Sequence, residues 1–245
     1  MNLKLIHIDE TESTNTESRN YLTKLEKGNN FCLVSSSQKA GKGQLGSVWV
    51  SEPGKNLTFS VVFSNLKLEV ADQFKLSALV SLNLLQALKN LGFFKVQLKW
   101  PNDIISNKHK IAGILIETII QNRLVNTAII GIGLNVNQTQ FKNLRQASSM
   151  KNISGIHYNL EEVLQQILLE MKKIPFQLKT RNTTDIFEKY HQFLFRKHQA
   201  SMFQFPGGEM QPGIIQGVQT NGELRILFED NHEKQFDVKE IKLVY

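Results

Sequence analysis

The sequence predicts an α+β protein in which a region of interleaved strands and helices precedes a small all-β module. Apolar residues at helical spacing alternate with short β-branched or alternating runs over most of the chain. From about Ser201 onward only short alternating runs remain. We therefore expect one domain over residues 1–199 and a second over residues 200–245, which suits a chain of 245 residues that is 41% hydrophobic.

Charge and cysteine usage limit the classes of protein that fit. The net charge of +7 comes from basic residues spread along the chain, so nucleic-acid binding is not indicated. Cys32, the single cysteine, falls in an expected strand, which favours a buried thiol in a reducing compartment. The sequence has no apolar signal region and no run as long as a membrane span, so we expect a cytoplasmic protein without a membrane partner.

The N-terminal segment combines a strand, a polar turn and a helix. Residues 3–8 read as a short strand, and a helix follows from about Thr16 to Lys27. The spacing Thr14-x-x-Glu17 is that of a capping box, and Ser13 and Asn15 are also favourable at a helix start. Capping and ligand binding both remain open for this trio, because a helix start also presents free N–H groups to a ligand.

A glycine-rich stretch, Gln38–Trp49, is the most informative part of the sequence. Its glycines, in the pattern Gly41-x-Gly43-x-x-Gly46, predict sharp bends, positive φ or close contact with a ligand. The pattern also matches the dinucleotide-binding fingerprint. Residues 47–54 are β-branched and then broken by Pro-Gly, so no helix follows and we reject that interpretation.

The chemistry of this stretch suits an anion. Turned backbone N–H groups together with Lys39 and Lys42 favour a carboxylate or a phosphate. Trp49 offers a flat indole that could stack on a base or close an apolar pocket. A surface loop without a ligand is the alternative, because glycine-rich loops are common.

The stretch Lys95–Ile105 carries a second group of candidates. A strand runs into Pro101, which rules out central-strand pairing and fixes a turn. Asn102 and Asp103 then lie at a rigid strand end, although Pro-Asn-Asp is also ordinary turn chemistry.

Two further strands follow it. The strand Lys110–Glu117 begins with a lysine and has Gly113 among apolar residues, which often marks the close approach of a ligand or backbone. In the run Leu124–Asn137, Asn135 and Asn137 are two residues apart and would point to one face, where they suit hydrogen bonding to a base or heterocycle.

The remaining elements supply the core and the C-terminal module. We expect a strand at 56–63 and amphipathic helices at about 71–91, 160–178 and 184–197. The six histidines lack the spacing of a zinc site. Alternating runs at 213–219, 223–228, 234–238 and 241–244 predict a barrel in the SH3 style, and a module of about 45 residues buries too little surface to be stable alone.

Five motifs in this order resemble the biotin–protein ligase family. They are Ser13-Thr-Asn15, Gln38-x-Ala-Gly-Lys-Gly-x-x-Gly-x-x-Trp49, Lys99-Trp-Pro-Asn-Asp103, Lys110-Ile-Ala-Gly-Ile-Leu-Ile-Glu117 and Gly131-Ile-Gly-Leu-Asn-Val-Asn137. The match extends over residues 3–137, and the C-terminal module resembles that family's last domain. The resemblance implies a class II synthetase-like catalytic domain, with a mixed or antiparallel sheet flanked by helices, followed by an SH3-like barrel.

The resemblance also implies an activity that uses biotin, ATP and Mg²⁺. In this family the biotin carboxylate attacks the α-phosphate of ATP, which releases pyrophosphate and leaves biotinyl-5′-AMP. A lysine amine of a biotin carboxyl carrier protein or domain then attacks this mixed anhydride. No helix-turn-helix domain precedes Asn15, so we expect the monofunctional type that does not bind DNA, and a homodimer remains open.

The family pattern implies roles for individual residues. The biotin site would comprise Ser13, Thr14, Asn15, Gln38, Lys42, Gly43, Gln44, Lys110 and Gly113. The ATP site would comprise Lys42, Gln44, Trp49, Asn102, Asp103, Lys110 and Asn135. Lys110, Lys42 and Asp103 would act in catalysis, since two anions meet only where fixed donors and cations neutralise them, and Asp103 would help hold Mg²⁺.

The glycine-rich stretch departs from the family pattern in its charge. Lys42, Gln44 and Ser47 stand where arginine-rich members carry arginine, and lysine lacks the bidentate fork of arginine. We therefore expect weaker retention of biotinyl-5′-AMP. Two other interpretations remain: a lipoate ligase or octanoyltransferase relative, which the Trp-Pro-Asn-Asp stretch and the C-terminal module disfavour, and a basic nucleic-acid binder, for which no recognition helix is visible.

Overall fold

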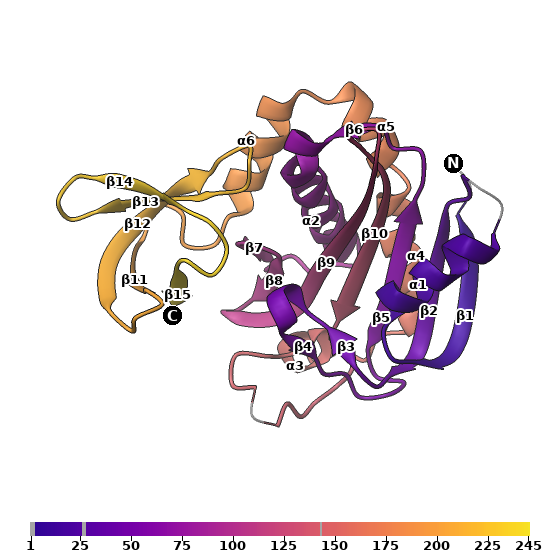
Figure 1. Ribbon diagram of the computed structural model, residues 1–245. Coiled ribbons are helices and arrows are strands. Elements are labelled where there is room, and N and C mark those ends of the chain that lie inside the picture. Colours follow the sequence, from indigo (N-terminus) through magenta and orange to yellow (C-terminus); the bar gives the residue numbers. More distant parts are fainter. Residues whose placement is uncertain (1–2, 26–27, 143) are drawn as a thin grey trace.

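A mixed eight-stranded sheet forms the centre of the structure, which is a computed structural model that describes residues 3–25, 28–142 and 144–245 (Figure 1). Its strands, in spatial order, are β1 (Lys4–Thr11), β2 (Phe31–Gln38), β5 (Leu57–Phe63), β10 (Leu124–Leu134), β9 (His109–Gln121), β8 (Asp103–Ser106) and β7 (Gln97–Lys99), with β6 (Leu68–Glu69) beside β10. Strands β1 and β2 are parallel and the other pairs are antiparallel. The mixed sheet flanked by helices confirms the expected fold class.

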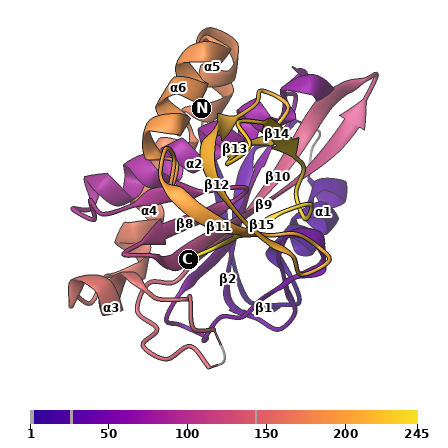
Figure 2. The same ribbon diagram turned by 90° about the vertical axis from the view of Figure 1, so that its left-hand side faces the viewer.

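The two faces of this sheet are covered unequally. Helix α2 (Gln73–Asn90) packs on one face, and α4 (Leu160–Met171), α5 (Ile174–Thr180) and α6 (Thr183–Phe193) pack against α2. Helix α1 (Thr14–Lys24) lies on the opposite face, against β2, β5 and β10 (Figures 1 and 2). Because α1 covers only one end of its face, the sheet beyond β10 is left for other elements.

Helix α2 supplies most of the helical side of the core. Twelve of its residues are buried, including the fully buried Leu76, Leu79 and Leu84. Truncating a leucine of this kind to alanine costs about 2–5 kcal/mol. No helix among the described residues is long and apolar enough to cross a membrane.

The C-terminal residues form a second, five-stranded antiparallel sheet. Its order is β14 (Glu233–Phe236), β13 (Leu224–Phe228), β12 (Met210–Val218), β11 (Ala200–Gln204) and β15 (Lys242–Val244). This sheet agrees with the expected SH3-like module, although β11 was not anticipated. Trp100 Nε1 donates to the Gly222 carbonyl at 2.8 Å, so this sheet is tied to the turn that follows β7.

Several elements differ from the sequence-based expectation. Helix α1 begins at Thr14, so the N-cap is Ser13 and not Thr14, and Ser13 makes no side-chain capping bond. The side chains of Thr14 and Asn15 instead contact Ser60. The capping box is therefore not formed, and the expected end of this helix at Lys27 lies outside the described residues. The helix expected over 160–178 is two helices, because Pro175 has no N–H with which to continue the ladder of α4.

The other differences concern helix and strand ends. The helix expected to reach Lys197 ends at Phe193, where α6 stops. The run expected to extend to Asn137 ends as a strand at Leu134, so Asn135 follows the sheet. Cys32 is buried and free, as expected, and burial raises the pKa of its thiol.

His191 on α6 contacts the second sheet at Val218 of β12. Its Nε2 lies 2.9 Å from Val218 N and 3.1 Å from Val218 O, so it accepts from the N–H or donates to the carbonyl according to its tautomer. Burial lowers the pKa of His191 below its ordinary value of 6.5; the Val218 carbonyl opposes this shift, and the cations Lys197 and Arg225 add to it.

We expect acidification to destabilise the fold through His191. Below about pH 6.5 the unfolded chain protonates this imidazole before the folded chain does, so the free energy of unfolding falls with falling pH. His191→Gln removes this titration, and the drop in Tm between about pH 7.5 and pH 5.5 should be smaller than in the wild type. Thermal unfolding at the two pH values tests this, with the exposed His157→Gln as control. An equal drop in all three proteins would contradict the assignment.

Candidate functional site

A cavity of about 440 Å³ lies on the face of the large sheet that α1 leaves open. In the register of the sheet, Gly113 on β9 is opposite Gly133 on β10, and Gly131 is opposite Leu115. The three glycines share one face with Ile129, which packs under α1. Since glycines carry no side chain, other groups can approach the backbone here: the Trp49 indole lies over Gly113 and Gly133, and the Asn15 amide lies over Gly131.

The glycine-rich stretch folds over this space as a short hairpin. Strands β3 (Gly41–Lys42) and β4 (Val48–Trp49) pair, and η1 (Gln44–Gly46) forms the tip. Gly43 N donates to Ser47 O at 2.7 Å, and Ser47 Oγ donates to Gln44 O at 2.8 Å. In this structure residues 41–49 therefore form a bonded hairpin and not an irregular surface loop.

Trp49 at the end of the hairpin lies against the sheet glycines. A Cβ at Gly133 would overlap the indole ring, and a Cβ at Gly113 would come within 3.1 Å of Trp49 Cζ3. The close approach expected at Gly113 is thus made by a side chain of the same chain. In the hairpin itself only Gly46 has a positive φ, of +83°; Gly43 has a φ of −107° and needs to be small because a Cβ would meet Ser47.

One end of the cavity is a buried network of uncharged polar groups. Gln38 Oε1 accepts from the Thr14 N–H at 3.0 Å. Ser60 Oγ lies 2.8 Å from Thr14 Oγ1 and 2.7 Å from Asn15 Oδ1, and Asn15 Nδ2 donates to Leu115 O at 3.3 Å. Such a network can accept and donate hydrogen bonds to a neutral polar ligand.

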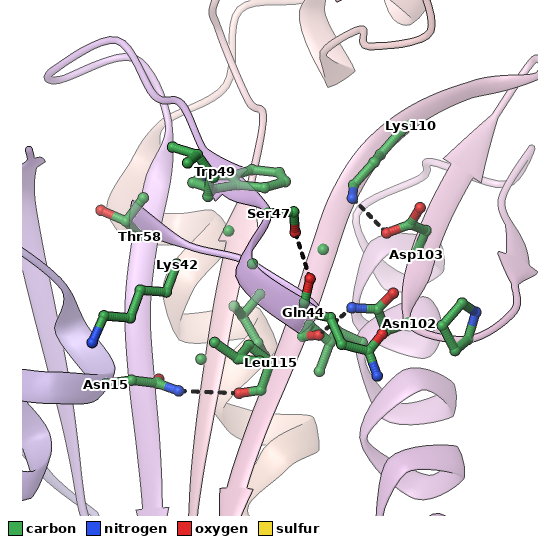
Figure 3. Close-up of a pocket in the computed structure, with 18 of the residues that line it drawn as sticks. Asn15, Lys42, Gln44, Ser47, Trp49, Thr58, Asn102, Asp103, Lys110 and Leu115 are labelled. Atoms are coloured by element: carbon green, nitrogen blue, oxygen red, sulfur yellow. Dashed lines mark hydrogen bonds and ion pairs between the residues drawn. The ribbon is translucent and has the colours of Figure 1, made fainter. Parts of the chain in front are cut away.

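The opposite end is charged. Lys110 Nζ lies 2.6 Å from Asp103 Oδ1 (Figure 3). Lys99 Nζ lies 3.6 Å from Asp103 Oδ2. Asn102 Nδ2 donates to Ile114 O at 2.8 Å, which fixes the turn beside them. The Lys110 ammonium also lies 5.5 Å from the centroid of a Trp49 ring. Asp103 is therefore held between two cations, on a strand end that Pro101 shapes.

The second sheet closes this charged end. Val238, Lys239 and Lys242 line the same cavity as Lys99 and Asp103. Burial lowers the pKa of Lys99; Asp103 opposes the shift, while Lys110 and Lys242 add to it. Sequence reasoning gave no role to the C-terminal lysines, because nothing in their local sequence distinguishes them from surface residues.

Most of the predicted site residues meet in this cavity. Its lining includes Thr14, Asn15, Gln38, Lys42, Gly43, Gln44, Trp49, Asn102, Asp103, Lys110 and Gly113. Ser13 is buried but is not part of the lining. Lys42 points away from Asp103, and its ammonium donates to Thr16 Oγ1 on α1 at 3.0 Å (Figure 3). The structure therefore separates Lys42 from Lys110, with which it was grouped as catalytic.

The two asparagines expected near a base are placed differently. Asn135 lines a neighbouring cavity of about 590 Å³ that shares Trp49, Lys99 and Lys110 with the first. Its Nδ2 donates to Ser148 O at 3.0 Å. Both amide atoms of Asn137 bond to the backbone of Tyr158, so this residue holds a loop and is not free for a ligand.

Ser60 and Lys99 were missed as functional candidates. Ser60 is fully buried on β5 between Thr14 and Asn15. An isolated serine in a strand carries no signal, whereas the position of Lys99 four residues before Asp103 could have been used.

Fold and cavity together describe an α+β protein whose candidate site has uncharged polar groups at one end and a lysine–aspartate cluster at the other. The sequence profile of the biotin/lipoate A/B protein ligase family matches residues 8–135. The chain belongs to this family.

Individual relatives agree with this. The chain is 33% identical over 148 residues to the bifunctional ligase/repressor BirA of Bacillus spizizenii, which covers 58% of this chain and 44% of that protein. It is 25% identical over 195 residues to the biotin–[acetyl-CoA-carboxylase] ligase of Mycobacterium tuberculosis, covering 78% of this chain and 71% of that protein. The biotin protein ligase from Aquifex aeolicus, solved in complex with biotin and ATP, has the same fold, with a TM-score of 0.80 over 98% of both chains at 24% identity.

We expect Gly133→Ala to displace the hairpin, because the new methyl group would overlap the Trp49 indole. Overpacking of this kind costs about 1–3 kcal/mol. The measurements are thermal unfolding and amide hydrogen exchange over residues 41–49. Gly207→Ala is the control, because a Cβ there meets nothing within 4 Å. Unchanged exchange in Gly133→Ala would show that Trp49 does not depend on that glycine.

Proposed function

We propose that this chain is an ATP-dependent biotin–protein ligase that forms biotinyl-5′-AMP and transfers biotin to a lysine of a biotin carboxyl carrier domain. The observation that carries the proposal is the two-ended cavity, in which a neutral polar network and a lysine–carboxylate cluster lie at opposite sides of one space (Figure 3). A ligand with a neutral polar head and a carboxylate tail matches this distribution. The names of the relatives support the same assignment.

Binding of biotin would use both ends of the cavity. Its neutral ureido head can exchange hydrogen bonds with Thr14, Asn15 and Gln38, whose side chains are already held by Ser60 and by each other. Its aliphatic part would lie between these ends, beside Leu115 on β9, because the Trp49 indole already covers the backbone at Gly113 and Gly133. The carboxylate would then reach the charged side, where the turned amides of the hairpin can bind it.

Lys110 is the residue we assign to the first chemical step. The carboxylate and the α-phosphate of ATP repel each other, and an ammonium between them lowers the energy of the transition state. Lys110 already contacts Asp103 at 2.6 Å and lies beside the Trp49 ring, so its position is fixed before the substrates bind. Asp103 keeps Lys110 oriented until a phosphate takes its place.

A divalent cation would enter with the nucleotide. Within residues 3–25, 28–142 and 144–245 there is no cluster of three or more His, Cys, Asp or Glu that could hold a resident metal. Asp103 is one carboxylate, and Mg²⁺ in such sites is usually held by one or two carboxylates together with phosphates. The donor set therefore fits Mg²⁺ that arrives on ATP, with Asp103 as the protein ligand that would help to hold it there.

Incorporation of radiolabelled biotin into a carrier domain, with ATP and Mg²⁺ present, tests the proposal. Radiolabelled lipoate is offered in parallel, because the family includes lipoate ligases. Biotin incorporation that requires ATP supports the assignment. Preferential incorporation of lipoate would replace it with the second candidate, and no incorporation of either would refute it.

We predict that Lys110→Ala abolishes adenylate formation without unfolding the protein. Loss of a charge at the reacting centre should cost several kcal/mol, or about a 10³-fold decrease in biotin-dependent pyrophosphate release. Lys95→Ala, at an exposed position before β7, is the matched control. A rate for Lys110→Ala within about tenfold of wild type would show that the assigned role is wrong.

We predict that Gln44→Arg slows release of biotinyl-5′-AMP. Gln44 lines the cavity at the hairpin tip and carries no charge, so a guanidinium there adds a bidentate donor for phosphate. The dissociation rate of the preformed adenylate should fall by about tenfold, as judged by chase experiments. Gln44→Met, which lacks both charge and donor, serves as control, and equal rates for the two variants would contradict this role.

A further inference from the structure

The charged side of the cavity has more lysine ammonium groups than the single carboxylate of Asp103 can neutralise. Lys99, Lys110, Lys239 and Lys242 line this side, whereas Lys42 lies beside α1, and Asp103 is the one carboxylate among the described lining residues. Asp103 already faces both Lys110 and Lys99. In the described part of the chain, neither Lys239 nor Lys242 has an acidic partner within ion-pair distance. These two ammonium groups are thus available to a multiply charged anion.

The backbone of Lys239 is held by a turn, and that of Lys242 lies on β15, which pairs with β11. Lys239 has a positive φ of +78°, which is uncommon for a residue with a side chain. The turn is bonded at both ends: Asp237 N donates to Glu240 Oε2 at 2.7 Å, and Glu240 N donates to Asp237 O at 3.1 Å. The bond from Trp100 to Gly222 holds the same sheet beside the large one.

The order of the strands gives the order of groups along the cavity. From the neutral side outward, Thr58 lies on β5, Gly133 on β10, Lys110 on β9, Asp103 on β8 and Lys99 on β7, with the second sheet beyond. Neighbouring strands are about 4.8 Å apart. A biotin carboxylate therefore approaches Lys110 from the α1 side, and the lysines of the second sheet lie on the far side of Lys110.

Displacement at phosphorus is in line, so the leaving group departs opposite to the nucleophile. In the proposed first step, a biotin carboxylate oxygen forms a bond to the α-phosphorus, and the bond from that phosphorus to the α,β-bridging oxygen breaks. The electron pair leaves with the bridging oxygen as pyrophosphate, and no proton is transferred because the carboxylate is already ionised. If the nucleophile comes from the α1 side, pyrophosphate leaves towards the second sheet.

We propose that Lys239 and Lys242 of the second sheet, together with Lys99, bind the pyrophosphate that leaves in the first step. This inference rests on the proposed ligase function, which sets the direction in which pyrophosphate leaves. The C-terminal sheet then supplies binding groups for activation of biotin and has no such role in transfer to the carrier, when pyrophosphate has already gone.

Calorimetric titration with magnesium pyrophosphate tests the site directly. The double variant Lys239→Met/Lys242→Met keeps the aliphatic stems and removes both charges, and its affinity for pyrophosphate should fall by at least about tenfold. Lys242→Arg should bind within about twofold of wild type, because it keeps the charge. Lys234→Met on β14, elsewhere in the same sheet, removes one charge away from the cavity and should have no effect. Thermal unfolding confirms that each variant is folded.

Two half-reactions then separate this role from a merely structural one. In the double variant the KM for MgATP in biotin-dependent pyrophosphate release should rise by about tenfold, while transfer from synthetic biotinyl-5′-AMP to a carrier domain stays within about twofold of wild type. Unchanged pyrophosphate affinity, or an equal loss in both half-reactions, would overturn the inference. Lysine-dependent pyrophosphate binding in a wild-type protein that shows no biotin-dependent turnover would support the site and count against the ligase function.

Discussion

The contact between the Trp49 indole and the bare backbone at Gly113 and Gly133 is the constraint on which the site depends. The ring lies where two side chains would otherwise project from neighbouring strands. It fixes the hairpin on the sheet, and it forms a wall of both cavities. Since Lys110 lies 5.5 Å from a Trp49 ring, the same contact also shapes the position of the principal cation. Gly113 and Gly133 are therefore required because the Trp49 side chain packs directly on the backbone there.

Unequal coverage of the large sheet determines where the ligand can lie. One face is closed by α2 and the helices behind it, whereas α1 covers only the β2–β5–β10 end of the other. The remaining area would be an exposed apolar surface if its residues were large. Instead the sequence places glycine, threonine and charged residues on that face, and the hairpin and the second sheet border it (Figure 1). The cavity is thus a consequence of how α1 and the second sheet flank an otherwise uncovered face.

The sequence allowed the fold class, the helix α2 and many of the polar residues of the cavity lining to be predicted, because these depend on local periodicity and short motifs. Thr14, Gln38, Trp49, Asp103 and Lys110 belong to motifs whose spacing is visible in the chain. What local sequence could not give were contacts set by strand register and by packing between distant segments. Ser60 acquires its role only because β5 lies under α1, and Lys242 only because the second sheet folds back on β7. The helix break at Pro175 was visible in the sequence and was overlooked.

The residues that line this cavity come from nearly the whole length of the chain, from Thr14 to Lys242. Contacts between segments so far apart form late in folding, because the entropy of closing a long loop must be offset before they contribute. During synthesis, a ribosome-bound chain that has folded its large sheet would still lack the last two cations of the site. Assembly of the cavity is thereby tied to completion of both sheets, so that a nascent or partly unfolded molecule would hold polyphosphate poorly.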